Sequence, residues 1–286
     1  MAQLELATKA KNTWCPGCGN FAILTSIKAV LKALVDEGTP LEKVVLVSGI
    51  GCHAKIVDYV NVNSFYSIHG RVVPVAEAIK IANPDLTVIG FAGDGDAYGE
   101  GLEHLVFAAK RNVDITMVIH NNRVYGLTTG QYTPTSPQGF KGRSTPRGAL
   151  EVPLNPLELM LASGATFLAR GYSHGLDLLK RVFREAISHK GFALVDVLQV
   201  CVTFFNMYEN YNQRVYELKE HDPTDYGQVS AKIREWDYNS DAPIAAGVLY
   251  RKLAPTFEEK FRKPAMDPAD RNKKLDELLR PERTTA

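Results

Sequence analysis

Two apolar segments that lead directly into glycine, aspartate or asparagine place the strongest constraint on the fold of this chain. Residues 87–91 and 115–119 are apolar at nearly every position, and residues 101–110 between them have the spacing of a helix. A strand that is apolar on both faces is typical of a parallel sheet covered by helices. The segments therefore predict a βαβ unit with a right-handed crossover.

The same alternation continues along most of the chain. Asn155 and Pro156 have the residue types of a helix cap and a first helical position, after a long loop at 126–153 rich in Gly, Pro, Ser and Thr. We expect an α/β fold with a doubly wound, mostly parallel sheet. The pattern predicts helices at 20–35, 101–110, 156–162 and 176–188 and strands at 44–48, 87–91, 115–119, 166–169 and 192–200.

The pattern changes near residue 205. Residues 204–216 are rich in aromatic side chains, and 15 of the 32 residues from 255 to 286 are charged. We therefore expect an α/β domain over residues 1–205 and a C-terminal extension over residues 206–286. Its charged end has too few apolar residues to bury a core, so it is either a solvated arm or a segment that packs on a partner subunit.

Composition narrows the class of protein. The 286 residues carry a net charge of +1, and the basic residues form no stripe, so we expect no nucleic-acid partner. No apolar run is long enough to span a bilayer, and residues 1–12 lack the apolar core of a secretion signal. These features predict a cytoplasmic protein with no membrane partner. In that reducing compartment, cysteines are better suited to metal ligation or redox chemistry than to disulfides.

Polar residues follow two neighbouring strands at the point where each strand ends. Asp94 lies between two glycines, and Asn122 follows 28 positions later, the length of one crossover. A carboxylate and an amide oxygen at adjacent strand ends suit Mg²⁺, while glycines let a diphosphate approach the backbone. We expect Asp94, Asn122, the carbonyl of Val124, two phosphate oxygens and a water as ligands. The alternative is that these are two ordinary strand-end turns.

Four cysteines form the second constellation: Cys15, Cys18, Cys52 and Cys201. A Cys-x-x-Cys pair, a third cysteine at a strand end and a fourth after another strand suit either a [4Fe-4S] cluster or structural Zn²⁺. Their spacing does not choose between a cluster, zinc and unrelated buried thiols. A dithiol redox motif fits less well, because residues 11–14 are not a hydrophobic strand and two cysteines would have no role.

Several short motifs resemble the beta subunit of 2-oxoacid:ferredoxin oxidoreductases, and Gly-Asp-Gly followed by Asn-Asn is the signature of thiamine diphosphate enzymes. The resemblance spans residues 11–216 and implies a thiamine diphosphate-binding domain whose four cysteines ligate one [4Fe-4S] cluster. The motifs are Cys-Pro-Gly-Cys-Gly (15–19), Gly-Ile-Gly-Cys (49–52), His-Gly-Arg (69–71), Gly-Asp-Gly-Asp (93–96), Tyr-Gly-Leu-Thr (125–128) and Gly-Phe-Ala-Leu-Val-Asp-Val (191–197).

The resemblance and the strand-end pattern together predict the residues around the cofactor. His69 is similar to the family's histidine beside the cofactor, where a neutral imidazole would donate a hydrogen bond to a phosphate or to the aminopyrimidine. A lone loop histidine is otherwise incidental, and His53 and His120 are assigned no role. The expected cofactor-binding residues are Ile50, Gly51, Cys52, His69, Gly70, Gly93, Asp94, Gly95, Asp96, Asn122, Val124, Tyr125, Gly126, Leu127 and Thr128.

Lys55 is the candidate residue for substrate choice. It follows Cys52 by three residues, and its ammonium could pair with a second substrate carboxylate. This favours 2-oxoglutarate, while a pyruvate-type enzyme stays open. Lys55 as a solvated lysine is an equally good interpretation, and Arg143 or Arg147 in the long loop could serve instead.

One element expected of a thiamine diphosphate enzyme is missing. The chain holds one doubly wound pattern, whereas these enzymes also need a domain whose glutamate acts on the aminopyrimidine; Glu77 is not assigned that role. We expect an alpha subunit to supply this glutamate and the coenzyme A site, and a ferredoxin to receive the electrons. The implied activity is oxidative decarboxylation of a 2-oxoacid. The alternatives are a non-oxidative lyase or synthase subunit with structural zinc and a noncatalytic subunit that only carries a cluster.

Overall fold

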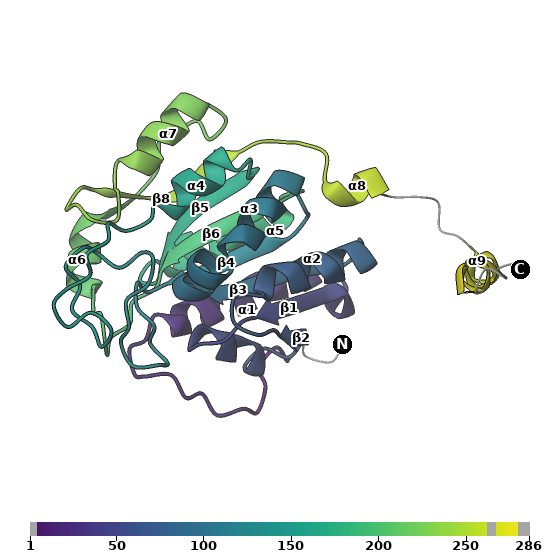
Figure 1. Ribbon diagram of the computed structural model, residues 1–286, viewed down its shortest axis with the longest axis horizontal. Helices are drawn as coiled ribbons and strands as arrows, with labels where there is room; N and C mark the ends of the chain where they lie inside the picture. Colours follow the sequence, from purple (N-terminus) through teal and green to yellow (C-terminus); the bar gives the residue numbers. More distant parts are fainter. Residues whose placement is uncertain (1–4, 262–266, 280–286) are drawn as a thin grey trace, which may run out of the picture.

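The computed structural model describes residues 5–261 and 267–279, and these residues form one eight-stranded sheet with helices on both faces (Figure 1). The strand order is β2-β1-β3-β4-β6-β5-β8-β7. The strands are β1 (Val44–Ser48), β2 (Asn63–Tyr66), β3 (Thr87–Gly93), β4 (Thr116–Asn121), β5 (Phe167–Tyr172), β6 (Ala193–Leu198), β7 (Val215–Glu217) and β8 (Ile244–Arg251).

The six neighbouring strands β2, β1, β3, β4, β6 and β5 pair in parallel, as predicted. Strand β8 pairs with β5 in the antiparallel direction. The strand order places the first half of the chain on one side of β4 and β6 and the end of the chain on the other. The helices and helical turns are α1 (Asn20–Asp36), η1 (Leu41–Lys43), η2 (His53–Asp58), α2 (Val72–Ala82), η3 (Gly95–Glu100), α3 (Leu102–Arg111), α4 (Pro156–Ala162), α5 (Leu176–Ser188), α6 (Tyr208–Arg214), α7 (Tyr226–Arg234), α8 (Phe257–Phe261) and α9 (Pro268–Leu279).

Each face of the sheet has its own hydrophobic core. In β3, Val88 and Ala92 face a core shared with α2, α3, α4 and α7, whereas Ile89 and Phe91 face a core shared with α1 and α5. Successive side chains of a strand point to opposite faces, so an all-apolar strand supplies both cores at once. The expected doubly wound α/β class is confirmed. The βαβ unit of β3, α3 and β4 brings the ends of β3 and β4 side by side.

The end of the chain contains more regular structure than its sequence predicts. Helices α6 and α7 and strands β7 and β8 lie beyond residue 205, and the expected boundary there falls inside the sheet. Asn112, at the end of α3, donates to the carbonyls of Ala254 and Pro255, and the carboxylate of Glu258 accepts from the backbone N–H of Asp114. These contacts hold residues up to α8 against the body.

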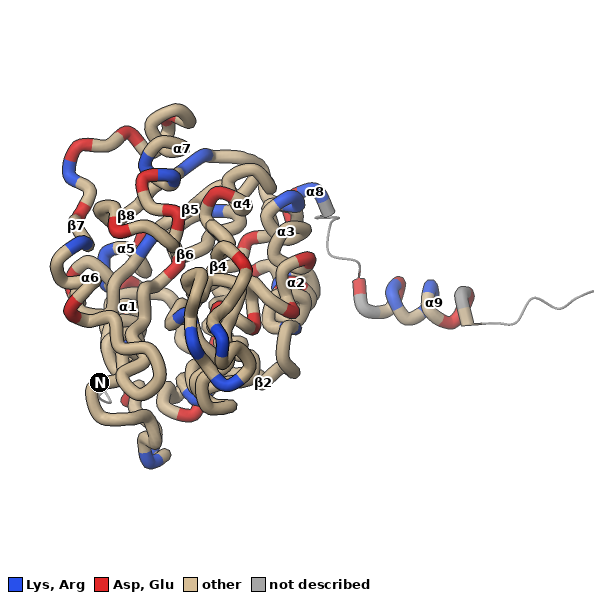
Figure 2. Tube along the Cα trace, turned by 60° about the vertical axis from the view of Figure 1, so that its left-hand side comes forward, with Lys and Arg blue, Asp and Glu red and all other residues tan. Residues whose placement is uncertain are grey.

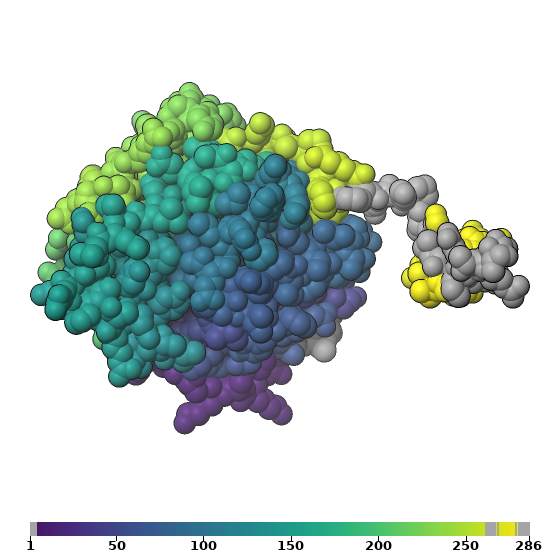
Figure 3. All heavy atoms as spheres, viewed as in Figure 1, coloured from purple at the N-terminus to yellow at the C-terminus, as the bar shows by residue number. Residues whose placement is uncertain are grey.

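The surface agrees with the charge pattern of the sequence. Figure 2 shows lysine and arginine interspersed with aspartate and glutamate over the elements. Helix α9 stands away from the body beyond α8 (Figures 1 and 3). Within the described ranges, no helix is both long and apolar enough to cross a membrane.

Candidate active site

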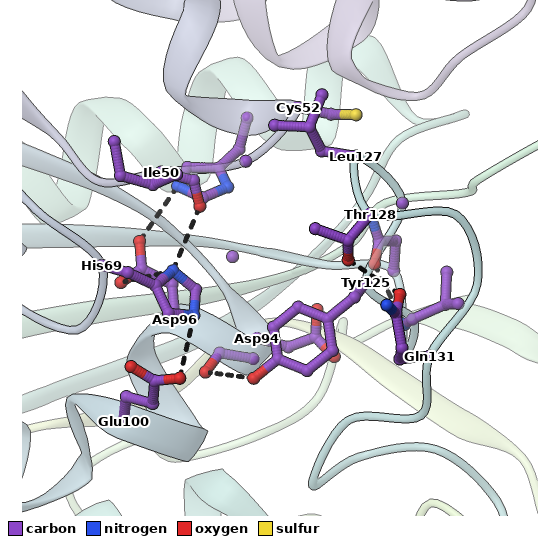
Figure 4. A pocket seen from close by; sticks show the side chains of 17 residues that line it. Ile50, Cys52, His69, Asp94, Asp96, Glu100, Tyr125, Leu127, Thr128 and Gln131 are labelled. Carbon is purple, nitrogen blue, oxygen red and sulfur yellow. Dashed lines mark hydrogen bonds and ion pairs between the residues drawn. The ribbon is translucent and has the colours of Figure 1, made fainter. Parts of the chain in front are cut away.

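A cavity of about 400 Å³ opens at the carboxyl ends of β1, β3 and β4. All of the predicted cofactor-binding residues except Gly70 line it. Figure 4 shows Ile50 and His69 on one side of the cavity and Tyr125, Thr128 and Gln131 facing them. The complete lining is Ile50, Gly51, Cys52, His53, His69, Gly93, Asp94, Gly95, Asp96, Glu100, Asn122, Val124, Tyr125, Gly126, Leu127, Thr128 and Gln131.

Asp94 lines the cavity and is almost completely buried, with a relative exposure of 2%. The hydroxyl of Thr135 donates to its Oδ2 at 2.8 Å. Burial raises the pKa of Asp94 to about 6, despite hydrogen bonds from Thr133 and Thr135 that lower it, because the charged carboxylate is desolvated. A divalent cation would stabilise this charge. The buried carboxylate, the Asn122 amide and the Val124 carbonyl form an oxygen-only donor set, which fits Mg²⁺.

The turn that presents Asn122 and Val124 depends on an unusual backbone conformation at the residue between them. Arg123 has a φ of 62°, in the left-handed region. Its buried guanidinium donates to the carbonyl of Thr135 at 2.7 Å and to the carbonyl of Tyr238. The N–H of Val124 donates to Asn122 Oδ1 at 3.1 Å. No sequence pattern indicated a role for Arg123, because its partners lie in the long loop and in the C-terminal segment.

Asp96 connects the loops around the cavity. Its carboxylate accepts from the N–H of Gly70 at 2.5 Å and lies 3.1 Å from Nε2 of the buried His53. A Cβ atom on Gly49 would lie 1.8 Å from Asp96 Oδ2, so only glycine fits there. The two aspartates of the Gly-Asp-Gly-Asp motif therefore differ: the carboxylate of Asp94 accepts from Thr135 in the long loop, while that of Asp96 connects the loops of Gly70 and His53.

His69 lies at the rim of the cavity and is partly exposed. Its Nδ1 is 3.3 Å from the carbonyl of Ile50, and its Nε2 is 3.7 Å from the carboxylate of Glu100 (Figure 4). Its ring is 5.9 Å from that of Tyr125. This position suits a hydrogen bond to a bound cofactor. Glu100 and Gln131 also line the cavity and were not predicted; Glu100 arrives there through the irregular turn η3.

The loop after β4 closes the other side of the cavity. The N–H of Tyr125 donates to the carbonyl of Gln131 at 2.9 Å, and Thr128 donates to the Gln131 side chain at 2.7 Å. A Cβ atom on Gly95 would lie 2.3 Å from the Tyr125 ring, so the close contact of the two loops requires glycine. The hollow between glycine-rich loops at strand ends fits a diphosphate.

The four cysteines line a second, smaller cavity that borders the first. Cys52, Asn122 and Gly126 line both cavities. A Cβ atom on Gly126 would lie 3.6 Å from Cys52 Sγ and 3.8 Å from Cys201 Sγ. The loop at Gly126 is therefore a thin wall between the cofactor cavity on one side and the sulfur atoms on the other, and we call it the shared wall.

The electrostatics of this second cavity favour a cationic group. Burial, and secondarily the other three cysteines, raises the pKa of Cys18 to about 12, and burial raises the pKa of Cys52. Four thiolates at such positions need positive charge close by, which iron or zinc supplies. Among the described residues, no three His, Cys, Asp or Glu side chains form a group that could hold a metal ion. A [4Fe-4S] cluster does not require several side chains to meet at one metal ion, since each thiolate ligates a separate iron atom.

Two protein families match this chain. The thiamine pyrophosphate enzyme C-terminal TPP binding domain matches residues 49–197, slightly more than half of the chain, and these residues contain all three strand ends around the cavity. The C-terminal region of the pyruvate ferredoxin oxidoreductase beta subunit matches residues 201–265. The two matches meet close to the expected boundary at residue 205.

Several proteins are similar to this chain over most of its length. The beta subunit of 2-oxoacid:ferredoxin oxidoreductase 1 from Aeropyrum pernix is 42% identical over 269 residues, which cover 89% of this chain and 82% of that protein. The chain belongs to the family of 2-oxoacid:ferredoxin oxidoreductase beta subunits. The 2-oxoglutarate oxidoreductase subunit KorB of Mycobacterium tuberculosis is 40% identical over 220 residues, covering 75% of this beta subunit and 58% of KorB.

A solved structure extends this agreement to the fold. The 2-oxoglutarate:ferredoxin oxidoreductase from Magnetococcus marinus, solved with 2-oxoglutarate, coenzyme A and succinyl-CoA bound, superposes with a TM-score of 0.86 at 32% identity. The match covers 96% of this beta subunit and 95% of that chain. The family expected from the motifs is thus confirmed, together with its enzymatic class and its thiamine diphosphate-binding domain.

Lys55 lies elsewhere in this beta subunit than the other predicted residues. It lines the cysteine cavity and does not line the larger one. Its Nζ donates to the hydroxyl of Thr13 at 2.8 Å, and its charge lowers the pKa of Cys52, opposing the larger effect of burial. No lysine or arginine is among the described residues that line the larger cavity. Lys55 therefore places a positive charge near Cys52, on the cysteine side of the shared wall.

Proposed function

We propose that this beta subunit, with an alpha subunit, catalyses the coenzyme A-dependent oxidative decarboxylation of a 2-oxoacid, with 2-oxoglutarate favoured. The products would be succinyl-CoA and CO₂, and the two electrons would pass singly through a [4Fe-4S] cluster to ferredoxin. The observation that carries this proposal is the shared wall. A cofactor cavity and four cysteines separated by one glycine loop suit transfer of electrons between two bound groups.

In this proposal the larger cavity holds Mg²⁺ and the diphosphate of thiamine diphosphate. Asp94, the side chain of Asn122 and the carbonyl of Val124 would hold the cation, and the loop at Tyr125–Thr128 would hold the phosphates. His69 would donate a hydrogen bond to the cofactor from the rim. When bound, thiamine diphosphate supplies the electron sink that decarboxylation of a 2-oxoacid requires.

The four cysteines would ligate the cluster. All four cysteines line one cavity, and the partly buried thiols of Cys18 and Cys52, whose pKa is raised, fit a group that supplies positive charge. When bound, the cluster supplies a one-electron acceptor at the far side of the shared wall. Four reduced thiols are also consistent with a cytoplasmic location, which belongs to this proposal.

An alpha subunit would supply the glutamate that acts on the aminopyrimidine, together with the coenzyme A site. Large apolar side chains around the cavity and on the segment after β2 are exposed: Ile50 at 45%, Leu127 at 48% and Ile68 at 73%. Exposed apolar groups of this kind mark interaction surfaces. Glu77 lies on α2, pairs with Arg111 at 3.2 Å and does not line the cavity, so its position does not suit a role in catalysis.

The C-terminal extension has two parts in this proposal. Residues up to α8 complete the sheet of the beta subunit, whereas α9 packs on a partner subunit. The support for the second statement is the position of α9 beyond the body in Figure 1 and the exposure of Leu275 at 47%.

Lys55 tests the substrate preference. If its ammonium pairs with the second carboxylate of 2-oxoglutarate, Lys55→Ile raises KM for 2-oxoglutarate about tenfold and leaves KM for pyruvate nearly unchanged, while Lys55→Arg retains most of the preference. Equal changes for both substrates would reject the assignment. Arg143→Leu and Arg147→Leu are the matched variants, and a selective effect of either one would move the role to the long loop.

The decisive experiment is anaerobic purification of this chain with its alpha subunit. We expect iron and acid-labile sulfide near four each per beta subunit, Mg²⁺-dependent binding of thiamine diphosphate, and viologen reduction that requires coenzyme A and a 2-oxoacid. A protein with zinc and no sulfide would indicate a non-oxidative enzyme. Absence of Mg²⁺-dependent thiamine diphosphate binding, with no change in affinity in Asp94→Ala, would indicate a subunit without catalysis. Viologen reduction with pyruvate but not with 2-oxoglutarate would identify the pyruvate type.

A further inference from the structure

The segment after β6 directs an amide donor at one of the cysteines. Gln199 follows β6 directly and is buried, with a relative exposure of 1%. Its Nε2 donates to the carbonyl of Val200 at 2.6 Å and to Cys18 Sγ at 3.5 Å. Its backbone N–H donates to the carbonyl of Asn121 at 3.1 Å, which fixes the residue at the end of the sheet. Because both partners of Nε2 are acceptors, the amide is oriented with its donor toward the sulfur.

A second donor reaches the other cysteine of the Cys-x-x-Cys pair. The hydroxyl of Thr203 donates to Cys15 Sγ at 3.4 Å. Thr203 lies in the tight turn between Cys201 and Phe205, where the N–H of Phe205 donates to the carbonyl of Cys201 at 3.1 Å. The side chain of Thr203 is exposed, so its hydroxyl is not required for packing of the core.

A third donor lines the same cavity without a partner. Asn20, the first residue of α1, is 1% exposed, and its Nδ2 has no hydrogen-bond partner among the described residues. Its Oδ1 lies 2.8 Å from Nδ1 of the buried His120, which holds the amide in place. A buried donor without a partner is costly unless a ligand accepts from it. Its position beside Cys18 therefore points to an acceptor inside the cysteine cavity.

From these contacts we propose that Gln199 and Thr203 are positioning residues that set the reduction potential of the cluster, with Asn20 as a further donor to it. This inference rests on the proposed function. Reduction adds one electron to the cluster and no proton, so the reduced form is more negative. N–H and O–H groups directed at the sulfur atoms stabilise that form and raise the potential. Without them, the cluster accepts electrons from the substrate less readily.

The test is a redox titration of the intact complex with dithionite, followed by the electron paramagnetic resonance signal of the reduced cluster. In Gln199→Met we expect the equilibrium constant for reduction to fall about tenfold, a shift of about 59 mV to more negative potential for one electron. Thr203→Val shifts the potential in the same direction by less, and Thr203→Ser keeps the wild-type value. Gln213→Leu, an exposed substitution on α6, is the control and leaves the potential unchanged.

Iron and sulfide content distinguishes the possible failures. A wild-type complex without iron and sulfide would overturn the proposed function and this inference together. A wild-type complex with a cluster, and variants with equal iron content and unchanged potentials, would overturn only the role of Gln199 and Thr203. Gln199 is buried, so Gln199→Met could lose the cluster altogether. In that case the reduction potentials of Thr203→Val and Thr203→Ser, at an exposed position, decide the inference.

Discussion

Asp94 carries a carboxylate that is almost completely buried although it lines the cavity, and this burial makes its ionisation costly. Burial raises its pKa to about 6 from an ordinary value of 3.8. Since the folded state holds the proton more tightly than the unfolded state, Asp94 reduces stability as the pH rises through this interval, and the full cost is present above pH 6. Below about pH 6, where Asp94 is largely protonated, binding of Mg²⁺ would release this proton; at neutral pH the cation would instead offset the cost of a carboxylate that is already ionised.

Asp94→Asn should therefore stabilise the protein without ligands and abolish Mg²⁺-dependent cofactor binding. Without Mg²⁺ and thiamine diphosphate, we expect its free energy of unfolding to exceed that of wild type by up to about 3 kcal/mol at neutral pH, with the difference shrinking toward pH 4. Urea unfolding at several pH values measures this. With both ligands present the order should reverse, because only wild type binds them. A pH-independent difference would contradict desolvation of the Asp94 carboxylate as its cause.

Gly49 illustrates how closely the loops around the cavity approach one another. A methyl group there would displace the Asp96 carboxylate, which joins the loops of Gly70 and His53. Gly49→Ala should lower the free energy of unfolding by about 2–4 kcal/mol and weaken cofactor binding at least tenfold. Thermal unfolding and isothermal titration measure the two effects. Gly175→Ala, whose new methyl group meets only ordinary contacts, should change neither.

At this scale the sequence predicted which residues line the cavity but not what each one does. Asp94, Asn122 and Gly126 were predictable because strand-end residues of a parallel sheet meet at one edge. Asp96 was predicted as a cofactor-binding residue and His53 was assigned no role, because the pairing between them depends on loops far apart in the chain. The unusual backbone of Arg123 depends on contacts with residues 12 and 115 positions away, which no local pattern contains.

At the scale of elements, the segment between α7 and β8 is connected to the larger cavity by hydrogen bonds through β6 and β4. The hydroxyl of Tyr238 donates to Asp196 in β6 at 2.6 Å, and Asn121 Nδ2 donates to the same carboxyl group at 2.9 Å. Asn121 Oδ1 is 2.9 Å from the hydroxyl of Thr135, which also donates to Asp94. A chain of buried hydrogen bonds thus leads from the C-terminal segment to the expected magnesium ligand.

Tyr238→Phe should lower the free energy of unfolding by about 1–3 kcal/mol, since it leaves a buried carboxyl group with one donor fewer. We also expect a several-fold weaker affinity for Mg²⁺ and thiamine diphosphate, because Asp196 holds Asn121 in place. Chemical denaturation and cofactor titration measure these effects. Tyr226→Phe changes an exposed side chain on α7 and is the matched control. Equal stabilities of the two variants would show that the hydroxyl on Asp196 contributes nothing.

The central strands were predictable and strands β2 and β8 were not, for one physical reason. Strands β3, β4 and β6 are buried on both faces, so their own residues are mostly apolar. All four residues of β2 are exposed. Strand β8, which lies between β5 and the edge strand β7, contains Ala245, Ala246 and Gly247, which favour strands weakly. Strands β2 and β8 form because a neighbouring strand offers hydrogen-bonding groups, and the residues of β2 and β8 themselves do not indicate this pairing.

At the scale of the whole molecule, the C-terminal extension separates into a part that stabilises the body and a part that extends beyond it. A chain truncated after residue 261 should keep its melting temperature and cofactor affinity but bind its partner subunit at least tenfold more weakly, if α9 packs there. A chain truncated after residue 253 loses the partners of Asn112 and should unfold at a lower temperature. Differential scanning calorimetry and analytical ultracentrifugation compare them. Unchanged partner affinity in the first truncation would exclude the proposed role of α9.

The position of Gly126 has a consequence for how oxygen inactivates the enzyme. Its loop lines the larger cavity on one side and lies next to the thiols of Cys52 and Cys201 on the other. If these thiols hold the proposed cluster, its oxidative destruction would leave their sulfur atoms free to move or to form a disulfide, next to the loop that is proposed to hold the diphosphate. Exposure to oxygen should therefore weaken the binding of thiamine diphosphate as well as stop electron transfer. Recovery of coenzyme binding would then require reassembly of the cluster first.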